Sequence, residues 1–395
     1  MSVKLNVDAV KNGTRFLIFP QPRFLKGFSK PEVVWIAAPP GTIKVGPEDD
    51  RMKVVDAIKK LHYNGTAPPY KGATNPKVIP GPGGHFDHLP INSREFLCAG
   101  TYAVVRRVLD IWEDYFGGTI PWHFAADFEK LEIIPFVEWN NSHAGHGFLE
   151  YGYERNENGG LDHSHPYCEN FDVLAHELGH NIIFSKVGIP TNPLDDRIDY
   201  DAMHESAADL VSVIALLHFT SVVKLLLKNT NGNLFTANEL GRIGELATSD
   251  QLSDAFNDLK MSVREEPHRR SLPLTGAIFD ILVEVFQKNL VKEGLITQDL
   301  ADRSNHDPGE PQDLESIAKD FKSSFKGKEK KFEMALLDAR DYLGHLLAWV
   351  WSNLDKDFLK FKNILDALFE ADKIISNGEH QDTIRDCFKW REILP

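Results

Sequence analysis

The spacing of hydrophobic and polar residues changes several times along this 395-residue chain. Two short runs near the N-terminus, RFLIF and EVVWIAAP, are rich in β-branched and aromatic residues and predict strands. The next stretch, MKVVDAIKKLHYN, places its apolar residues at helical spacing and predicts a helix within residues 52–64. Pro, Gly and Asn then crowd residues 65–93, which we expect to form an ordered connector.

The middle of the chain mixes helix and strand signals. The stretch REFLCAGTYAVVRRVLDIWEDYFG predicts a helix that ends at Gly117 and Gly118. KLEIIPFVEW and GFLEYGYE predict strands, and the alternation in GFLEYGYE favours a half-solvated edge strand. In the turn-rich stretch that follows, His163 and His165 are expected to be loop histidines, because they lack carboxylate or cysteine partners at ligand spacing.

The second half of the chain reads as mainly helical. FDVLAHELGHNIIF and MHESAADLVSVIALLHF predict two apolar helices, joined by the loop VGIPTNPLDDRIDYD. Another apolar helix follows Pro267, and residues 314–394 predict three or so amphipathic helices. We therefore predict an α+β fold with segments 1–64, 65–93, 94–186 and 187–395.

Composition and charge narrow the possible partners. The chain is 42% hydrophobic and 26% charged, as in soluble globular proteins, and its net charge of −14 argues against nucleic acid or an anionic membrane. No apolar run is long enough to span a membrane, and the first residues do not resemble a signal peptide. We expect a cytoplasmic protein, although a processed secreted form stays open. The oligomeric state is not indicated.

The sequence His176-Glu177-Leu178-Gly179-His180 carries the strongest chemical signal. On a helix, residues four apart project from the same face, so His176 and His180 can bind one ion. Glu177 lies beside them and could act as a general base on a water at that ion. This is the HExxH motif of zinc enzymes. Cys98, Cys168 and Cys387 are too widely spaced to suggest a thiolate zinc site.

The histidine pair needs a third metal ligand and a hydrogen-bond acceptor, and two carboxylates are candidates for these roles. Glu205 and Asp209 lie four apart on the next apolar helix, where buried carboxylates require cations or hydrogen-bond donors. Zinc and a zinc-bound histidine would meet that requirement. Glu205 is thus the predicted third ligand, and Asp209 the predicted acceptor for the free ring N–H of a ligand histidine.

Together these residues resemble the gluzincin pattern, and among gluzincins the thermolysin-like peptidases. In that family a helix, an edge strand and an aspartate precede the zinc helix; the matching pieces here are REFLCAGTYAVVRRVLDIW, HAGHGFLEYG and Asp172. The resemblance covers roughly residues 95–395. It implies a sheet-and-helix N-terminal lobe, a central zinc helix and a mainly α-helical C-terminal lobe.

The same resemblance implies residues that stabilise the oxyanion. The family has a histidine some sixty residues beyond the glutamate ligand, and His268 follows Glu205 by 63 residues. A family tyrosine shares that role, and Tyr200 is the one tyrosine in the loop before Glu205, although its offset differs.

Three positions depart from the family. His204 precedes the glutamate ligand where the family usually has Asn. His143-Ala144 replaces the family's Asn-Ala on the edge strand, so substrate binding is assigned to Ala144 and the nearby Asn141. The acidic residues of the family's double calcium site are missing around Leu216, so calcium binding stays open.

The sequence therefore predicts a zinc-dependent metalloendopeptidase that acts on peptides or proteins. Zn²⁺ is held by His176, His180 and Glu205, with Glu177 as general base and His268 at the oxyanion. Two alternatives remain. One is an aminopeptidase-type gluzincin, although the family's Gly-x-Met-Glu-Asn signature is missing. The other is an inactive zinc-binding scaffold that recognises a protein partner.

Overall fold

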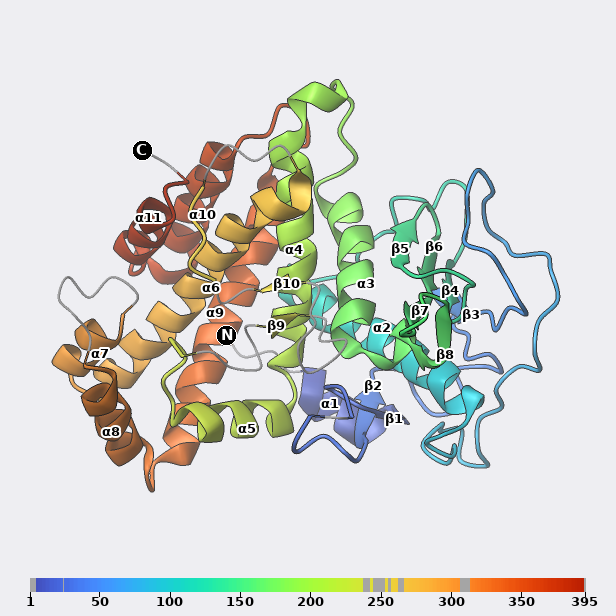
Figure 1. The fold of residues 1–395 in the computed structure, drawn as a ribbon, viewed down its shortest axis with the longest axis horizontal. Coiled ribbons are helices and arrows are strands. Elements are labelled where there is room, and N and C mark those ends of the chain that lie inside the picture. Colours follow the sequence, from blue (N-terminus) through green and yellow to red (C-terminus); the bar gives the residue numbers. More distant parts are fainter. Residues whose placement is uncertain are drawn as a thin grey trace. The chain divides into compact units, whose positions relative to one another are not determined.

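The computed structural model describes residues 5–23, 25–236, 242–243, 253–254, 257–261, 266–305 and 313–393. It is an α+β protein with about 49% helix and 11% strand, and its sheets are small. Figure 1 shows the elements. Among the described residues, the chain divides into two compact units, and the boundary between them lies between Gly188 and Ile189. The N-terminal unit holds the main sheet, and the C-terminal unit is mostly helical.

The N-terminal unit is built around a four-stranded mixed sheet in the order β3-β4-β6-β5. The first three strands of that order are parallel, and β5 runs antiparallel to β6. Their bounds are Met52–Val54 (β3), Leu131–Ile134 (β4), Phe148–Tyr151 (β6) and Ser142–Gly145 (β5). Two antiparallel pairs complete the unit: Thr14–Ile18 (β1) with Glu32–Ile36 (β2), and Tyr153–Arg155 (β7) with Leu161–Pro166 (β8).

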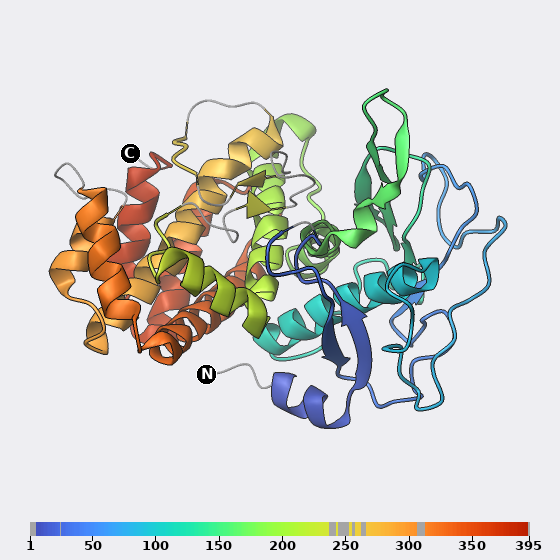
Figure 2. The same ribbon diagram turned by 60° about the horizontal axis from the view of Figure 1, so that its bottom comes forward.

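The helices of this unit are Leu5–Asn12 (α1), Arg94–Phe116 (α2) and Phe171–Lys186 (α3). The predicted helix at α2 is confirmed: the Ser93 hydroxyl accepts a hydrogen bond from the Phe96 backbone N–H, and Gly117 ends the helix with a φ of 72°. Helix α2 packs against α3 and against the β1–β2 pair, as Figure 2 also shows. A short 3-10 turn, Tyr167–Glu169, leads into α3.

A buried acidic network holds residues 55–75 on one face of the main sheet. Glu150 is fully buried, pairs with Lys60 and accepts hydrogen bonds from the Tyr63 backbone N–H and from His143. Burial alone would raise the pKa of Glu150, but the His143 and Lys60 hydrogen bonds outweigh it and lower that pKa. Glu132 accepts in the same way from the Tyr63 hydroxyl, at 2.8 Å.

This network explains two wrong predictions. The expected helix over residues 52–64 is absent, because β3 takes residues 52–54 and Lys60 and Tyr63 turn inward to buried carboxylates. The predicted edge strand GFLEYG is interior, since β6 lies between β4 and β5 with all four residues buried. Among the described strands of this sheet, β5 and β3 are the edges.

Helices dominate the described part of the C-terminal unit. They are Ile198–Leu216 (α4), Thr220–Thr230 (α5), Pro267–Lys292 (α6), Gln298–Ser304 (α7), Leu314–Phe325 (α8), Glu329–Asn353 (α9), Phe361–Ser376 (α10) and Gln381–Trp390 (α11). A 3-10 turn, Leu194–Asp196, precedes α4, and Arg242–Ile243 (β9) pairs with Ser253–Asp254 (β10). The main packing pairs are α4 with α6, α6 with α9, and α9 with α10. Of residues 249–263, which were expected to belong to the mainly helical half of the chain, the structure describes only residues 253–254 and 257–261.

A buried ion pair fixes the end of the chain to α6. The Arg391 guanidinium donates to both oxygens of Asp280, at 2.8 and 3.0 Å, and both side chains are almost fully buried. Arg391 also donates to the side chain of Asn257. The guanidinium fits because Gly276 has no side chain: a Cβ there would lie 2.7 Å from the Arg391 Cζ.

Within the described residues, no individual helix combines the length and apolar character that a membrane span requires. The pair α4 and α5, bent by 94°, meets those criteria together.

Candidate functional site

Helix α3 places the two motif histidines by its own geometry. Asn170 caps the helix, and its side chain accepts from the backbone N–H groups of Asp172 and Val173. His176 and His180 follow one turn apart, with ring centroids 4.7 Å apart and ring planes at 90°. Both are half-buried, whereas the rest of the helix from Phe171 to Ile183 is buried. The helix thus presents two half-buried imidazoles along one stripe of an otherwise buried segment.

Glu177 lies between these histidines in sequence and is 7% exposed. Its neighbour is Tyr151 of β6: burial raises the pKa of the Tyr151 hydroxyl, and the charge of Glu177 raises it further. The same hydroxyl donates to the backbone oxygen of Leu174, at 3.4 Å. Sequence reasoning missed Tyr151, because the strand pattern does not reveal which face of β6 meets α3.

Helix α4 carries the two predicted carboxylates. Glu205 is half-buried, and Asp209, one turn later, is 3% exposed. The Nε2 atom of His268, in the first turn of α6, lies 3.5 Å from a carboxylate oxygen of Glu205. His268 is well exposed, and its Nδ1 lies 2.7 Å from the Glu266 carboxylate. Packing of α4 on α6 therefore brings Glu205 and His268 together across 63 residues of sequence.

The predicted loop before Glu205 is partly wrong, because α4 already begins at Ile198 and includes Tyr200. Tyr200 is 2% exposed, and its ring stacks on His204 with centroids 5.8 Å apart. Burial raises the pKa of the Tyr200 hydroxyl. An ion pair between Asp199 and Arg270, with Arg270 Nε 2.7 Å from the carboxylate, ties the same turn of α4 to α6.

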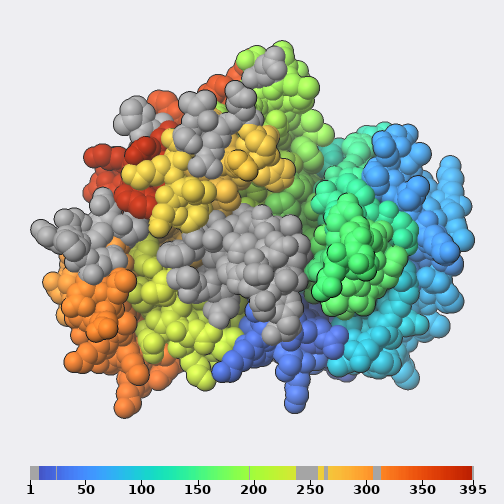
Figure 3. Space-filling view, in the orientation of Figure 1, coloured from blue at the N-terminus to red at the C-terminus, as the bar shows by residue number. Residues whose placement is uncertain are grey.

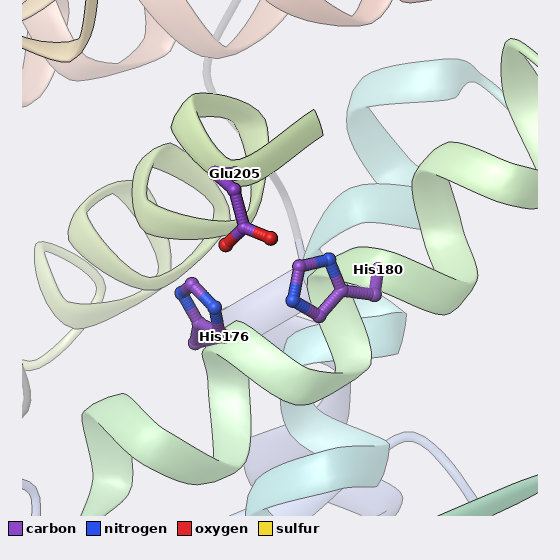
Figure 4. A group of neighbouring side chains, drawn as sticks. All are labelled: His176, His180 and Glu205. Atoms are coloured by element: carbon purple, nitrogen blue, oxygen red, sulfur yellow. The ribbon is translucent and has the colours of Figure 1, made fainter. Parts of the chain in front are cut away.

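Figure 4 draws the three predicted zinc ligands, His176, His180 and Glu205. One possible ligand atom from each lies within 4.8 Å of the other two. Two imidazoles and one carboxylate form a donor set that Zn²⁺ accepts, and three protein ligands are usual for catalytic zinc. The chemistry of these side chains therefore fits the ion that the sequence predicts.

The two predicted substrate-binding residues lie at the edge strand β5. Ala144 is on the strand, opposite Leu149 of β6, and Asn141 is exposed just before it. The Asn141 backbone oxygen accepts from the Gly152 N–H at 3.0 Å. His143 stands where the thermolysin-like peptidases have Asn. It turns its ring to Glu150, with Nε2 2.8 Å from the carboxylate, and so belongs to the buried network under the sheet.

Other side chains that could bind a metal have hydrogen-bond partners within the N-terminal unit. Asp172 is buried and accepts from the Gln21 side chain at 3.4 Å. His163 and His165 lie on strand β8, so their expected place in a loop is wrong. Each faces a carboxylate that the sequence reasoning overlooked: Glu138 at 2.9 Å from His163 and Asp162 at 2.9 Å from His165. Both histidines are well exposed. Figure 3 shows the surface of the segment that forms the β7–β8 pair in green.

Comparison with known proteins does not assign this chain to a family. A scan of the chain against protein families found no match, and a search of curated proteins found none either.

Proposed function

We propose that this protein is a zinc-dependent metallopeptidase of the gluzincin type, similar to the thermolysin-like peptidases, and that it cleaves internal peptide bonds. The observation that carries the proposal is the joint presence of His176, His180 and Glu205 as a group able to hold one metal ion. Support also comes from Glu177, which is buried beside the histidines on α3.

Each side chain has a role in this proposal. Bound to the three ligands, Zn²⁺ would supply a Lewis acid that lowers the pKa of a water and polarises a carbonyl. Glu177 would accept the proton of the attacking water and deliver it to the leaving amine. His268, which lies beside Glu205, would donate a hydrogen bond to the carbonyl oxygen as negative charge develops there.

The choice of an endopeptidase over an aminopeptidase rests on Glu150. An aminopeptidase needs an accessible acid near the edge strand to bind the free substrate N-terminus. Glu150, the acid opposite His143 of β5, is fully buried and bound to Lys60 and His143. Its carboxylate is therefore unavailable to a substrate amine.

The substitution Glu177→Gln tests the catalytic assignment. It preserves shape but removes the base, so hydrolysis of a blocked, internally quenched peptide should fall by about 10²–10⁴-fold or more. Zinc measured by elemental analysis should stay near one per chain, because Glu177 is not a ligand. The matched control is Glu95→Gln on the exposed side of α2, which should leave both readings unchanged.

Other outcomes separate the alternatives. Full activity of Glu177→Gln would reject Glu177 as the base. Cleavage of free-amine substrates alone would indicate an aminopeptidase. Stoichiometric zinc without cleavage of any library peptide would indicate the zinc-binding scaffold.

A further inference from the structure

A fully buried amide on α3 takes no part in the mechanism described above. Asn181 is 0% exposed, and neither Nδ2 nor Oδ1 of its side chain has a hydrogen-bond partner among the described residues. Burying an amide without hydrogen bonds costs free energy, so nearly all buried polar groups in folded proteins are paired. An amide that stays unpaired on the helix of the motif histidines is therefore a candidate for a role in function.

Hydrogen bonds hold the backbone of α3 at this residue. The Ser185 hydroxyl donates to the backbone oxygen of Asn181 at 2.7 Å and accepts from the backbone N–H of His123 at 3.1 Å. These bonds join the last turns of α3 to the segment between α2 and β4. The backbone of Asn181 is therefore fixed, while the hydrogen-bonding capacity of its amide stays unused.

Glu177, the proposed general base, lies one helical turn before Asn181. Side chains four residues apart on a helix are neighbours, with Cβ atoms roughly 5–6 Å apart, and polar pairs at this spacing can form hydrogen bonds. Glu177 is 7% exposed and Asn181 is 0% exposed, so water has little access to compete for either group. The helix repeat thus places an unused donor beside the carboxyl group that the mechanism needs.

Tyr151 of β6 is a second buried polar group near Glu177. Burial raises the pKa of its hydroxyl, and the charge of Glu177 raises it further. That hydroxyl donates to the backbone oxygen of Leu174 at 3.4 Å. Because a hydroxyl has a single proton to donate, Tyr151 has none left for Glu177, whereas both amide protons of Asn181 are unused.

We propose that Asn181 is a positioning residue for Glu177. As the Glu177 carboxyl group turns toward the attacking water, Asn181 Nδ2 donates a hydrogen bond to the carboxyl oxygen that does not take the proton. The other oxygen then stays directed at the water, and Asn181 itself gains and loses no proton. The assignment of Asn181 rests on the proposed role of Glu177 as general base.

The unpaired amide links the stability of the fold to the rate of the reaction. An interaction that forms only during the reaction lowers its barrier more than one already present in the resting state. The cost of the unpaired Asn181 amide falls on the folded state, and its benefit falls on the reaction. Removal of the amide should therefore slow the reaction without lowering stability, whereas loss of a merely structural asparagine should lower both.

The substitution Asn181→Leu removes the amide at nearly constant volume. The thermal midpoint of the full chain should not fall, because no side-chain hydrogen bond of the resting state is lost. For a blocked, internally quenched peptide, kcat should fall about tenfold, the effect of one ordinary hydrogen bond, while KM changes by less than about twofold. Zinc measured by elemental analysis should be the same as in the unchanged chain.

A double-mutant cycle with Glu177→Gln tests whether the effect passes through Glu177. In that background the base is absent, so Asn181→Leu should leave the residual kcat unchanged. The matched control is Asn192→Leu, because Asn192 is 8% exposed and its amide also has no hydrogen-bond partner among the described residues. Its thermal midpoint should not fall either, and its kcat should equal that of the unchanged chain.

The proposal is overturned if Asn181→Leu keeps the kcat of the unchanged chain, if its thermal midpoint falls together with kcat, or if it lowers kcat equally in both backgrounds. Circular dichroism checks that each variant folds. Asn181→Ala also lacks the amide and decides the kcat comparison if Asn181→Leu does not fold. Failure of the unchanged chain to cleave any peptide would reject the proposed function itself, and the role of Asn181 with it.

Discussion

The histidine pair of α3 and the Glu205–His268 pair of the C-terminal unit are positioned in different ways. His176 and His180 lie four apart on one helix, so the helix alone sets their 4.7 Å ring separation. Glu205 and His268 belong to α4 and α6, and only the packing of those helices brings their side chains to 3.5 Å. The first pair depends on local structure, and the second on a tertiary contact.

The two residue pairs should therefore differ in how strongly they respond to changes in the surrounding packing. A helix that keeps its hydrogen bonds keeps its i, i+4 pair even when the surrounding packing loosens. A pair held by helix packing is lost once the packing shifts by an ångström or two. Substitutions far from the site should therefore affect the Glu205–His268 pair more than the histidine pair.

The largest effect is expected from the local pair itself. His180→Ala removes a proposed zinc ligand, so zinc affinity should fall by more than the roughly 10–100-fold that follows loss of a partner outside the ligand set. Zinc retained after dialysis against a weak chelator, measured by elemental analysis, reports the change. His165→Ala on β8 is the control, and equal zinc loss in both variants would contradict the assignment.

A smaller effect is expected from loss of the buried Arg391–Asp280 ion pair, which fixes the end of the chain to α6. Arg391→Met leaves Asp280 buried without its cation, which should cost about 3–5 kcal/mol in urea denaturation. Since α6 carries His268, peptidase activity should respond before zinc binding at His176 and His180 does. Arg385→Met is the matched control: its exposed pair with Asp382 should contribute at most about 1 kcal/mol. Similar losses of unfolding free energy in the two variants would contradict the stabilising role assigned to the Arg391–Asp280 ion pair.

The smallest effects come from two helical glycines with opposite surroundings. Gly276→Ala places a Cβ 2.7 Å from the Arg391 Cζ, and that guanidinium is held by Asp280, so about 1–3 kcal/mol should be lost. Gly100→Ala in α2 meets no atom closer than 4.0 Å and gains helix propensity, so about 0.5–1 kcal/mol should be gained. Thermal midpoints of the two variants should move in opposite directions. A shift of the same sign in both would show that packing around the glycines does not decide the outcome.

Where the local sequence pattern is strong, the predicted helix or strand is confirmed. The α2 helix, with its Ser93 cap and Gly117 end, follows from apolar spacing and end signals. Strands β1, β2 and β4 follow from β-branched runs. The error at residues 52–64 arose because Lys60 and Tyr63 bind acids that are distant in sequence, and this tertiary contact overrides helical spacing.

The role of a strand within its sheet could not be read from alternation. GFLEYG alternates like an edge strand, yet Glu150 is buried there because Lys60, Tyr63 and His143 satisfy its charge. Likewise, His163 and His165 were expected in a loop, but the β7–β8 pairing extends through them. Hydrogen-bond partners from other segments are invisible to a local pattern.

The sequence by itself determined the chemical candidates: two histidines at i and i+4, the glutamate between them and the carboxylates of the next helix. The geometry of the histidine pair follows from the helix repeat, which any helical segment must obey. Only the tertiary structure decided that His268 lies beside Glu205 and that the charge of Glu177 acts on the Tyr151 hydroxyl. Those contacts join residues distant in the chain, and the packing of buried surfaces selects them, not local spacing.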